Sequence, residues 1–328
     1  MIQEVAHNIF RILVPSPVSV LKPPVNLYYF GGKDGLLWDA GYGTRSDVGY
    51  VIRDLENIFK LMRKRGEKGG LENILISHAH TDHFAGMAPL RQHTGANILL
   101  TPAMAARTGS ERAYRKAWQE NPGLLRPHAP TLTRVVLPFL EWMQDRLCGV
   151  HWIPDPDIII PPAHTLKAGN RILTTLPVPG HADDHIALYC PAEGLIFSGD
   201  LVLRTMTPWL GPPRSNINDY EDSLARLSSL PLNRIFPAHG SPIEAPAVHL
   251  AKALAHSKKR TARVLHHVLR ASKEGIAFHS LIKQLYPRSS AVMRLSAEGW
   301  VLLTLRMLIE EKKIRARKKG VQWCFAVL

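Results

Sequence analysis

The stretch Ser77-His-Ala-His-Thr-Asp-His-Phe-Ala-Gly86 gathers three histidines and one aspartate within six residues. It follows the apolar run Asn73-Ile-Leu-Ile, which predicts a short buried strand, so the polar side chains begin where that strand ends. A tight loop there can direct two histidines towards one point and the last two polar residues towards an adjacent point. Imidazole nitrogens and carboxylate oxygens are ligands that zinc and similar divalent metals accept. The stretch therefore predicts a metal site whose first ligands are His78, His80, Asp82 and His83.

Three later segments each supply one more candidate ligand at the end of a predicted strand. Pro179-Gly-His181 follows the apolar run Thr174-Thr-Leu-Pro-Val, and Phe236-Pro-Ala-His239 places another histidine after a short apolar stretch. Phe197-Ser-Gly-Asp200 supplies a carboxylate, whose two oxygens can bridge two cations. Each segment is weak evidence alone, but the ordered set of four motifs predicts one common site.

The order of these motifs resembles the metallo-β-lactamase superfamily over about residues 10–245. The resemblance implies an αββα sandwich with two Zn²⁺ ions per chain at one edge, and iron or manganese are the alternative metals. The ligand sets that it implies are His78, His80 and His181 for one metal, Asp82, His83 and His239 for the other, and Asp200 as the bridge. Asp39, in Leu37-Trp-Asp-Ala-Gly41, resembles an earlier Asp-x-Gly element of the family and would orient ligands. The alternative for Asp39 is a residue that only ends a hairpin.

Two adjacent cations can hold a bridging water and lower its pKa from about 15.7 to about 7, so that hydroxide exists at neutral pH. That hydroxide would attack an acyl carbon or a phosphorus atom, and no serine or cysteine nucleophile is required. Asp82 is the candidate catalytic residue, because it can orient the hydroxide and carry a proton as well as bind metal. Loops outside the motifs must therefore select the substrate.

The rest of the first 245 residues alternates strands with helices, which indicates a layered α/β architecture. Helices are expected over 47–65 and 219–230. Strands are expected over 12–14, 26–30, 36–38, 73–76, 98–100, 171–175, 186–190, 195–197 and 235–236. Residues 102–164 look like a helical insert with proline-rich ends, anchored by Trp118 and Trp142, which could act as a lid over the metals.

Composition favours a soluble globular protein, because 45% of the residues are hydrophobic and 21% are charged. The chain has no long apolar run and no basic start followed by an apolar block, so neither a membrane helix nor a signal peptide is expected. Cys148, Cys190 and Cys324 are too sparse for a disulfide framework or a cysteine metal site. These features predict a cytoplasmic protein without a membrane partner.

The net charge of +14 is concentrated at one end of the chain. Residues 246–328 contain 17 lysines and arginines against 4 glutamates, whereas residues 1–245 contain 24 basic and 23 acidic residues. Such asymmetry predicts two functional regions, with RNA or another polyanion as the partner of the basic one. A solvated basic surface is the alternative.

The basic region is expected to form a second, small domain over residues 246–328. Helices are expected over 249–270, 278–286 and 295–311, followed by a hairpin, and this order is typical of a winged helix. Lysines and arginines gather at the last helix end and on the hairpin, namely Lys312, Lys313, Arg315, Arg317, Lys318 and Lys319. They could position a nucleic-acid backbone. Winged helices also serve as structural or dimerisation modules, so a homodimer is an alternative use.

The surroundings of His181 favour one chemistry among several. Pro179-Gly-His-Ala-Asp-Asp-His-Ile-Ala-Leu188 resembles glyoxalase II-like hydrolases and β-lactamase-like endoribonucleases, although the loop over 203–218 is longer here. We favour hydrolysis of a thioester, ester or lactone in a small acyl substrate. The alternatives are a metal-dependent nuclease acting on single-stranded RNA, and a non-hydrolytic use such as an iron dioxygenase. Asp184 is unassigned, and His185 is expected to support a ligand or touch the substrate.

Overall fold

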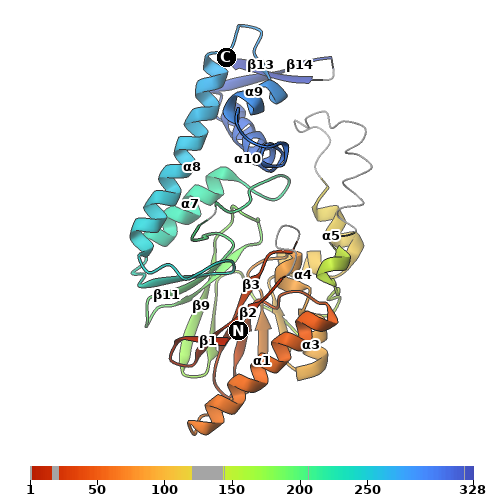
Figure 1. Cartoon of the computed structure of the whole chain (residues 1–328), viewed down its shortest axis with the longest axis vertical. Coiled ribbons are helices and arrows are strands. Elements are labelled where there is room, and N and C mark those ends of the chain that lie inside the picture. The colour runs from red at the N-terminus through yellow and green to blue at the C-terminus, as the bar shows by residue number, and fades with distance from the viewer. Residues whose placement is uncertain (1, 17–21, 120–142, 144, 206, 321) are drawn as a thin grey trace.

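The computed structural model of the chain describes residues 2–16, 22–119, 143, 145–205, 207–320 and 322–328. Two β-sheets lie face to face, and helices cover the outer side of each (Figure 1). This arrangement confirms the predicted layered α/β sandwich. None of the helices in the described ranges is long and apolar enough to cross a membrane. Cys148, Cys190 and Cys324 are all buried and unpaired, as their spacing predicted.

The first sheet has seven strands and joins an antiparallel half to a parallel half. Its strands are, in spatial order, β1 (Ile2–Ala6), β2 (Ile9–Val14), β3 (Val25–Phe30), β4 (Leu36–Trp38), β5 (Asn73–Leu75), β6 (Asn97–Leu100) and β7 (Ile158–Ile159). The helices that follow β4, β5 and β6 are α1 (Arg45–Lys64), α2 (Thr81–Phe84), α3 (Met87–Thr94), α4 (Pro102–Thr108) and α5 (Glu111–Ala117). α1 and α3 pack on the outer face of this sheet.

The second sheet has five strands, and two of its inner strands are buried on both faces. Its strands are, in spatial order, β12 (Arg234–Pro237), β11 (Leu195–Gly199), β10 (Ile186–Cys190), β9 (Arg171–Pro177) and β8 (His164–Ala168). Successive strand residues point to opposite faces. Ile186 and Leu188 therefore join the core shared with the first sheet, whereas Ala187 and Tyr189 join a core under α7 (Ile217–Ser228).

Local signals explain where the long outer helices begin and end. Thr44 caps α1, because its hydroxyl accepts the N–H of Asp47 at 3.3 Å, and Gly66 beyond the last turn takes a left-handed φ of 75°. Asn216 caps α7 by accepting the N–H of Asp219 at 3.1 Å. Both helices thus start two residues earlier than the apolar spacing predicted.

The prediction of a helical insert over 102–164 is wrong in part, because this segment also contains strand residues. α4 and α5 occupy its start, and Trp142 lies outside the described residues. Ile158–Ile159 was expected to be part of a proline-rich link but forms β7, one of the two edge strands of the first sheet. Prolines are tolerated beside an edge strand, since one side of it needs no partner. β8 was also missed, because it is an edge strand with a half-exposed, mostly polar pattern.

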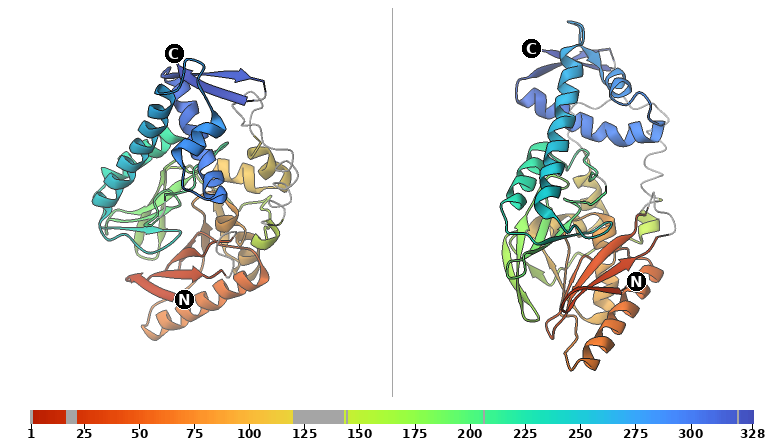
Figure 2. Two further views of the ribbon diagram at one scale, coloured as in Figure 1. Left: turned by 45° about the horizontal axis from the view of Figure 1, so that its top comes forward. Right: turned by 60° about the vertical axis from the view of Figure 1, so that its left-hand side comes forward.

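The basic C-terminal region contains the expected helices and hairpin. Its elements are α8 (Pro246–Leu269), β13 (Ile276–Ala277), α9 (Phe278–Leu285), α10 (Ala291–Glu310), β14 (Ile314–Lys319) and β15 (Gln322–Val327). α8 packs against α7 and runs from the sandwich into this region (Figure 2). One buried cluster includes Leu224 of α7, Leu250 of α8 and Trp300 of α10, so the two regions share apolar packing. The assignment as a separate winged-helix domain stays a prediction.

Candidate metal centre

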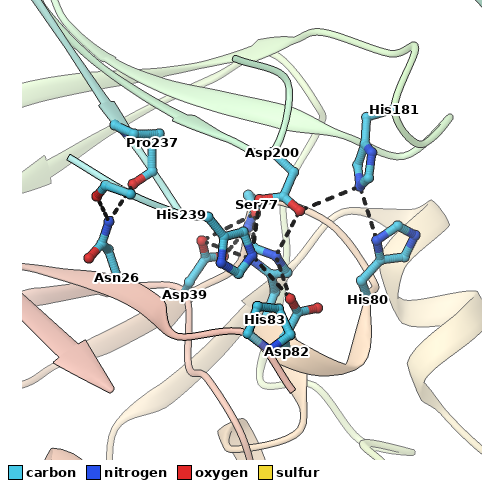
Figure 3. A network of polar contacts seen from close by, with 12 residues as sticks. Asn26, Asp39, Ser77, His80, Asp82, His83, His181, Asp200, Pro237 and His239 are labelled. Atoms are coloured by element: carbon cyan, nitrogen blue, oxygen red, sulfur yellow. Dashed lines mark hydrogen bonds and ion pairs between the residues drawn. The ribbon is translucent and has the colours of Figure 1, made fainter. Parts of the chain in front are cut away.

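Three of the predicted ligands meet as a tight group of imidazole nitrogens, which we call the histidine group (His78, His80 and His181). His181 Nε2 lies 3.1 Å from His80 Nδ1 (Figure 3). It lies 3.2 Å from His78 Nε2. His78 and His80 precede α2, whereas His181 follows β9, so the group joins the first sheet to the second. Nitrogens that face one another at these distances suit a cation, because each neutral ring offers a lone pair.

The other four predicted ligands form a second group, which we call the carboxylate group (Asp82, His83, Asp200 and His239). Their ligand atoms all lie within 4.8 Å of one another. His239 Nε2 lies 3.2 Å from Asp82 Oδ2, and His83 Nε2 lies 3.6 Å from Asp200 Oδ2. α2 supplies two of these side chains, and the ends of β11 and β12 supply the others (Figure 3). The structure thus brings all seven predicted ligands together.

Asp200 faces both groups at once. Its Oδ2 lies 3.7 Å from His181 Nε2 in the histidine group and 3.6 Å from His83 Nε2 in the carboxylate group. Its Oδ1 lies 3.5 Å from His239 Nε2. A single carboxylate in this position can bind two cations, as the resemblance implied.

Two buried atoms of the carboxylate group support metal binding independently of the motif. Within the described residues, His83 Nε2 and Asp200 Oδ1 have no hydrogen-bond partner although both atoms are inaccessible to solvent. A buried polar atom without a partner costs about 1–3 kcal/mol. A cation coordinated by these atoms would remove that cost, so the residues fit the metals that the fold implies.

The histidine group is held in the neutral state that a metal requires. Burial lowers the pKa of His78 and His80 well below the usual range, and the neighbouring histidines lower the two pKa values further. The charge of Arg214 also lowers the pKa of His80. A neutral imidazole keeps the lone pair that binds metal, so no proton has to leave at neutral pH.

The carboxylate group instead stabilises positive charge. Burial alone would lower the pKa of His239, but the carboxylates of Asp200 and Asp82 outweigh burial and raise it to about 9. The pKa of His83 is likewise raised well above its usual range, by Asp39 first and then by Asp82 and Asp200, against the effect of burial. The four residues therefore hold a proton or a metal cation between the carboxylates.

Asp39 lies behind the ligands, as the family resemblance implied. Its Oδ2 is 3.0 Å from His83 Nδ1, and its Oδ1 accepts the N–H of Ser77 at 2.7 Å. Asp39 follows β4 with a positive φ of 63°, a conformation that turns the chain sharply at this point. Ser77 Oγ in turn lies 3.0 Å from His78 Nδ1. Such contacts fix the ring orientation of ligating histidines.

Backbone carbonyls orient two further histidine ligands, His181 and His239. His181 Nδ1 donates to the carbonyl of Trp209 at 2.7 Å, and His239 Nδ1 donates to the carbonyl of Pro24 at 2.6 Å. Each bond places the proton on Nδ1 and leaves Nε2 free as a ligand atom. Asn26 Nδ2 donates to the carbonyl of Pro237 at 3.0 Å and so ties the end of β12 to the first sheet (Figure 3).

His185 supports the ligands rather than joining them. Its Nε2 accepts the N–H of Asp200 at 3.1 Å, and its ring stacks on His78 with centroids 4.8 Å apart. The ring is almost fully buried. This placement agrees with the first of the two roles expected for His185 and explains the glycine before Asp200, because a Cβ at Gly199 would meet the His185 ring at 2.7 Å.

Three residues beside the histidine group were not identified from the sequence. Trp118, expected only to anchor packing, stacks on His80 with centroids 5.3 Å apart. Asp184 is fully buried and accepts the N–H of Ala79 at 3.2 Å, between two ligands. Arg214 forms ion pairs with Asp184 and its neighbour Asp183. Trp118 and Arg214 belong to no motif, and Asp184 lies in the motif around His181 but was left unassigned, so only the fold reveals their contacts with the site.

The loop over 203–218 lies against the centre. Besides the contact of Trp209, Ser215 Oγ donates to the carbonyl of His181 at 2.6 Å. Ser215 Oγ also accepts the N–H of Gly211 at 3.1 Å, which closes the loop on itself. The longer loop therefore borders the histidine group directly.

Residues 22–239 match the family described as the metallo-beta-lactamase superfamily. The chain belongs to this superfamily. The match covers more than half of the chain and includes all seven candidate ligands. The names of two curated relatives, a probable metallo-hydrolase and an acyl-coenzyme A thioesterase, also support a hydrolase.

Three curated relatives align with this protein over most of its length. The probable metallo-hydrolase YqjP of Bacillus subtilis is 34% identical over 274 residues, which cover 78% of each chain. The beta-lactamase-like protein 2 homolog of Drosophila melanogaster is 25% identical over 97% of this chain and 94% of its own. The acyl-coenzyme A thioesterase MBLAC2 of Gallus gallus is 26% identical over 64% of this chain and 69% of its own.

Solved structures share the fold over the whole chain. A metallo-beta-lactamase family protein of Thermus thermophilus is similar with a TM-score of 0.70 at 22% identity, covering 99% of this chain and 100% of that one. A beta-lactamase domain protein of Burkholderia ambifaria is similar with a TM-score of 0.75 at 18% identity, covering 100% and 93%. The shared fold therefore includes the C-terminal region.

Proposed function

We propose that the protein hydrolyses an acyl thioester at a centre that holds two Zn²⁺ ions. The observation that carries this proposal is the position of Asp200, whose carboxylate faces the histidine group on one side and His83 on the other. When bound, two such cations lower the pKa of a shared water to about 7 and polarise the carbonyl oxygen of the substrate. The chain offers three nitrogens for one cation and three ligands besides Asp200 for the other.

The side chains of the carboxylate group would control the proton of the attacking water. The Asp82 side chain is 19% exposed and that of Asp200 is 12% exposed, so Asp82 is the more open of the two. Asp82 can therefore accept the proton of the water and later deliver it to the leaving thiolate. Asp39 holds the ring of His83 from behind and keeps the group aligned.

A basic cavity supports a thioester of a phosphate-bearing carrier as the substrate. The cavity has a volume of about 380 Å³, and its wall includes Val202 and Leu203, which follow Asp200 closely in the chain. Lys252 and His256 of α8 also line it. The pKa of His256 is lowered by partial burial and by the nearby cations Arg260 and Lys259, so positive charge is concentrated there. The relative named as an acyl-coenzyme A thioesterase favours the same class.

The proposed activity can be tested with zinc-loaded protein on S-lactoylglutathione, an acyl-coenzyme A, a simple ester and a lactone. We expect thioester turnover, and we expect Asp200→Asn to lower kcat/KM by at least about 100-fold, because losses of this size follow even when residues around a metal site are changed. Asp222→Asn removes an exposed carboxylate of α7 and should leave the rate unchanged. The proposal is wrong if no thioester is hydrolysed, or if the Asp200 variant retains full activity.

RNA hydrolysis is a second candidate, which the charge of the C-terminal hairpin favours. Lys312, Arg317 and Lys318 are exposed at the start of this hairpin and along β14, where they could contact a phosphate backbone. The test is cleavage of labelled single-stranded RNA with and without a chelator. Cleavage that persists in the Asp200→Asn variant would point to a contaminating nuclease.

A further inference from the structure

Arg214 presents a buried donor that the protein itself does not use. Its side chain is only 3% exposed, and within the described part of the chain its Nη1 has no hydrogen-bond partner. The other nitrogens are paired, since Nε lies 3.1 Å from Asp183 Oδ1 and Nη2 contacts Asp184 Oδ1. A buried guanidinium with one unpaired nitrogen is costly unless an acceptor arrives from elsewhere.

The contacts of Arg214 fix it relative to the histidine group. Asp184 is fully buried and binds both Arg214 and the N–H of Ala79, the residue between His78 and His80. Trp118 provides a second link, because its ring stacks on His80 and lies 5.5 Å from the guanidinium carbon of Arg214. Asp184 and Trp118 therefore hold the guanidinium of Arg214 close to the histidine group.

Building on the proposed function, we propose that Arg214 Nη1 binds a carboxylate carried by the acyl part of the substrate. A carboxylate is the acceptor that gains most from a guanidinium, since the hydrogen bond is charge-assisted. Asp183 and Asp184 partly neutralise Arg214, but the side chain of Asp183 is 51% exposed, so water screens its charge. The protein would thus select acyl groups with a second, anionic end over neutral ones.

Arg107 supplies a matched control, because it binds the same two aspartates and its own buried nitrogen without a hydrogen-bond partner, Nη1, already faces one of them. Its Nη2 donates to Asp183 Oδ2 at 2.5 Å, and its Nη1 lies 3.0 Å from Asp184 Oδ2 in an ion pair that is poorly aligned for a hydrogen bond. Removing Arg107 therefore disturbs the cluster around Asp184 but leaves the nitrogen of Arg214 in place.

Equilibrium binding of two small thiols tests the assignment without any turnover. The probes are 3-mercaptopropionate and its methyl ester, whose thiol binds zinc and whose other end differs only in charge. In zinc-loaded protein, calorimetry should show the acid binding at least about tenfold more tightly than the ester, which corresponds to one charge-assisted hydrogen bond. Arg214→Met should bring the two dissociation constants close together, whereas Arg107→Gln should preserve the preference.

Arg214→Lys is a milder variant, because lysine keeps a positive charge beside the two aspartates but lacks the planar guanidinium donor. This variant should also reduce the preference for the acid over the ester. Equal binding of acid and ester by the unmodified protein would overturn the assignment, as would an acid preference that survives in both Arg214 variants. Absence of thioester hydrolysis would refute the proposed function alone, because binding of the thiols requires no reaction.

Discussion

The carbonyl oxygen of Trp209 lies 2.7 Å from His181 Nδ1, so a surface loop fixes the ring of a candidate metal ligand. The loop is itself supported by the C-terminal region. A Cβ built on Gly299 of α10 would lie 3.0 Å from the Cα of Gly211 and 3.1 Å from the carbonyl of Leu210. The basic region is therefore in contact with the histidine group through this loop.

Replacing Gly299 by leucine should weaken zinc binding at the histidine group. The larger side chain must push Gly211 away and shift the carbonyl that orients His181, and such changes around a metal site typically cost about 10- to 100-fold in affinity. Gly49→Leu is the control, because a side chain at that position of α1 meets nothing within 4 Å. Zinc titration against a chromogenic chelator measures both variants. Unchanged zinc affinity in the Gly299 variant would show that α10 does not support the site.

Asp39→Asn should weaken zinc binding at the carboxylate group. Asparagine keeps the size of the side chain and can still accept the N–H of Ser77, but it removes the negative charge 3.0 Å from His83 Nδ1. The ring of His83 then becomes a poorer ligand, with an expected loss of about 10- to 100-fold in affinity. Competition titration with a chelator checks this expectation. Equal affinities would reduce Asp39 to a residue that only ends the hairpin.

Metal-free protein should lose stability as the pH rises from about 6.5 to about 9. The pKa of His239 is raised from 6.5 to about 9 in the folded state, so its proton stabilises the fold fully below 6.5. That contribution disappears as the pH passes through the folded pKa, and it is on the order of 3 kcal/mol. Urea unfolding at several pH values measures it.

The control for this pH dependence is His239→Gln, which should lose less stability over the same window because the proton of His239 no longer contributes. Zinc-loaded protein should not show the loss either, since a cation then replaces the proton between the carboxylates. If the stability of the metal-free protein rises or stays level between about pH 6.5 and about pH 9, the charge distribution described for the carboxylate group is wrong.

Lys252→Glu should raise the KM for an acyl-coenzyme A several-fold while leaving a short, uncharged thioester unaffected. The reversed charge would repel the carrier phosphates in the cavity that Lys252 lines. Lys258→Glu is a matched control, because Lys258 is an exposed residue of the same helix that does not line the cavity. Steady-state kinetics on both substrates separates the outcomes. Parallel effects of the two variants would indicate a general influence of charge and no specific carrier site.

Much of the centre could be predicted because each ligand is marked locally. His78, His80 and Asp82 lie within one short stretch after a strand, and Asp200 and His239 each follow an apolar run that ends in a turn. Strands of a sandwich end at common edges, so side chains just beyond those ends meet in space. The family resemblance then divided the ligands into two sets, which the distances reproduce.

The residues around the ligands were harder to predict, because their roles arise from packing alone. Arg214 and Asp184 are 30 positions apart and meet only when the loop folds over His181. Trp118 belongs to a segment whose apolar pattern also suits ordinary packing. The edge strands β7 and β8 were missed for a similar reason, since proline neighbours and polar, half-exposed residues resemble a loop in the sequence.

The most direct test of the account is anomalous diffraction at the zinc absorption edge from crystals of zinc-loaded protein. We expect two peaks, one coordinated by His78, His80 and His181 and the other by Asp82, His83 and His239, with Asp200 between them and ligand distances of about 2.0–2.2 Å. A single peak, a peak elsewhere in the chain, or a map in which Asp200 binds neither ion would contradict the central claim.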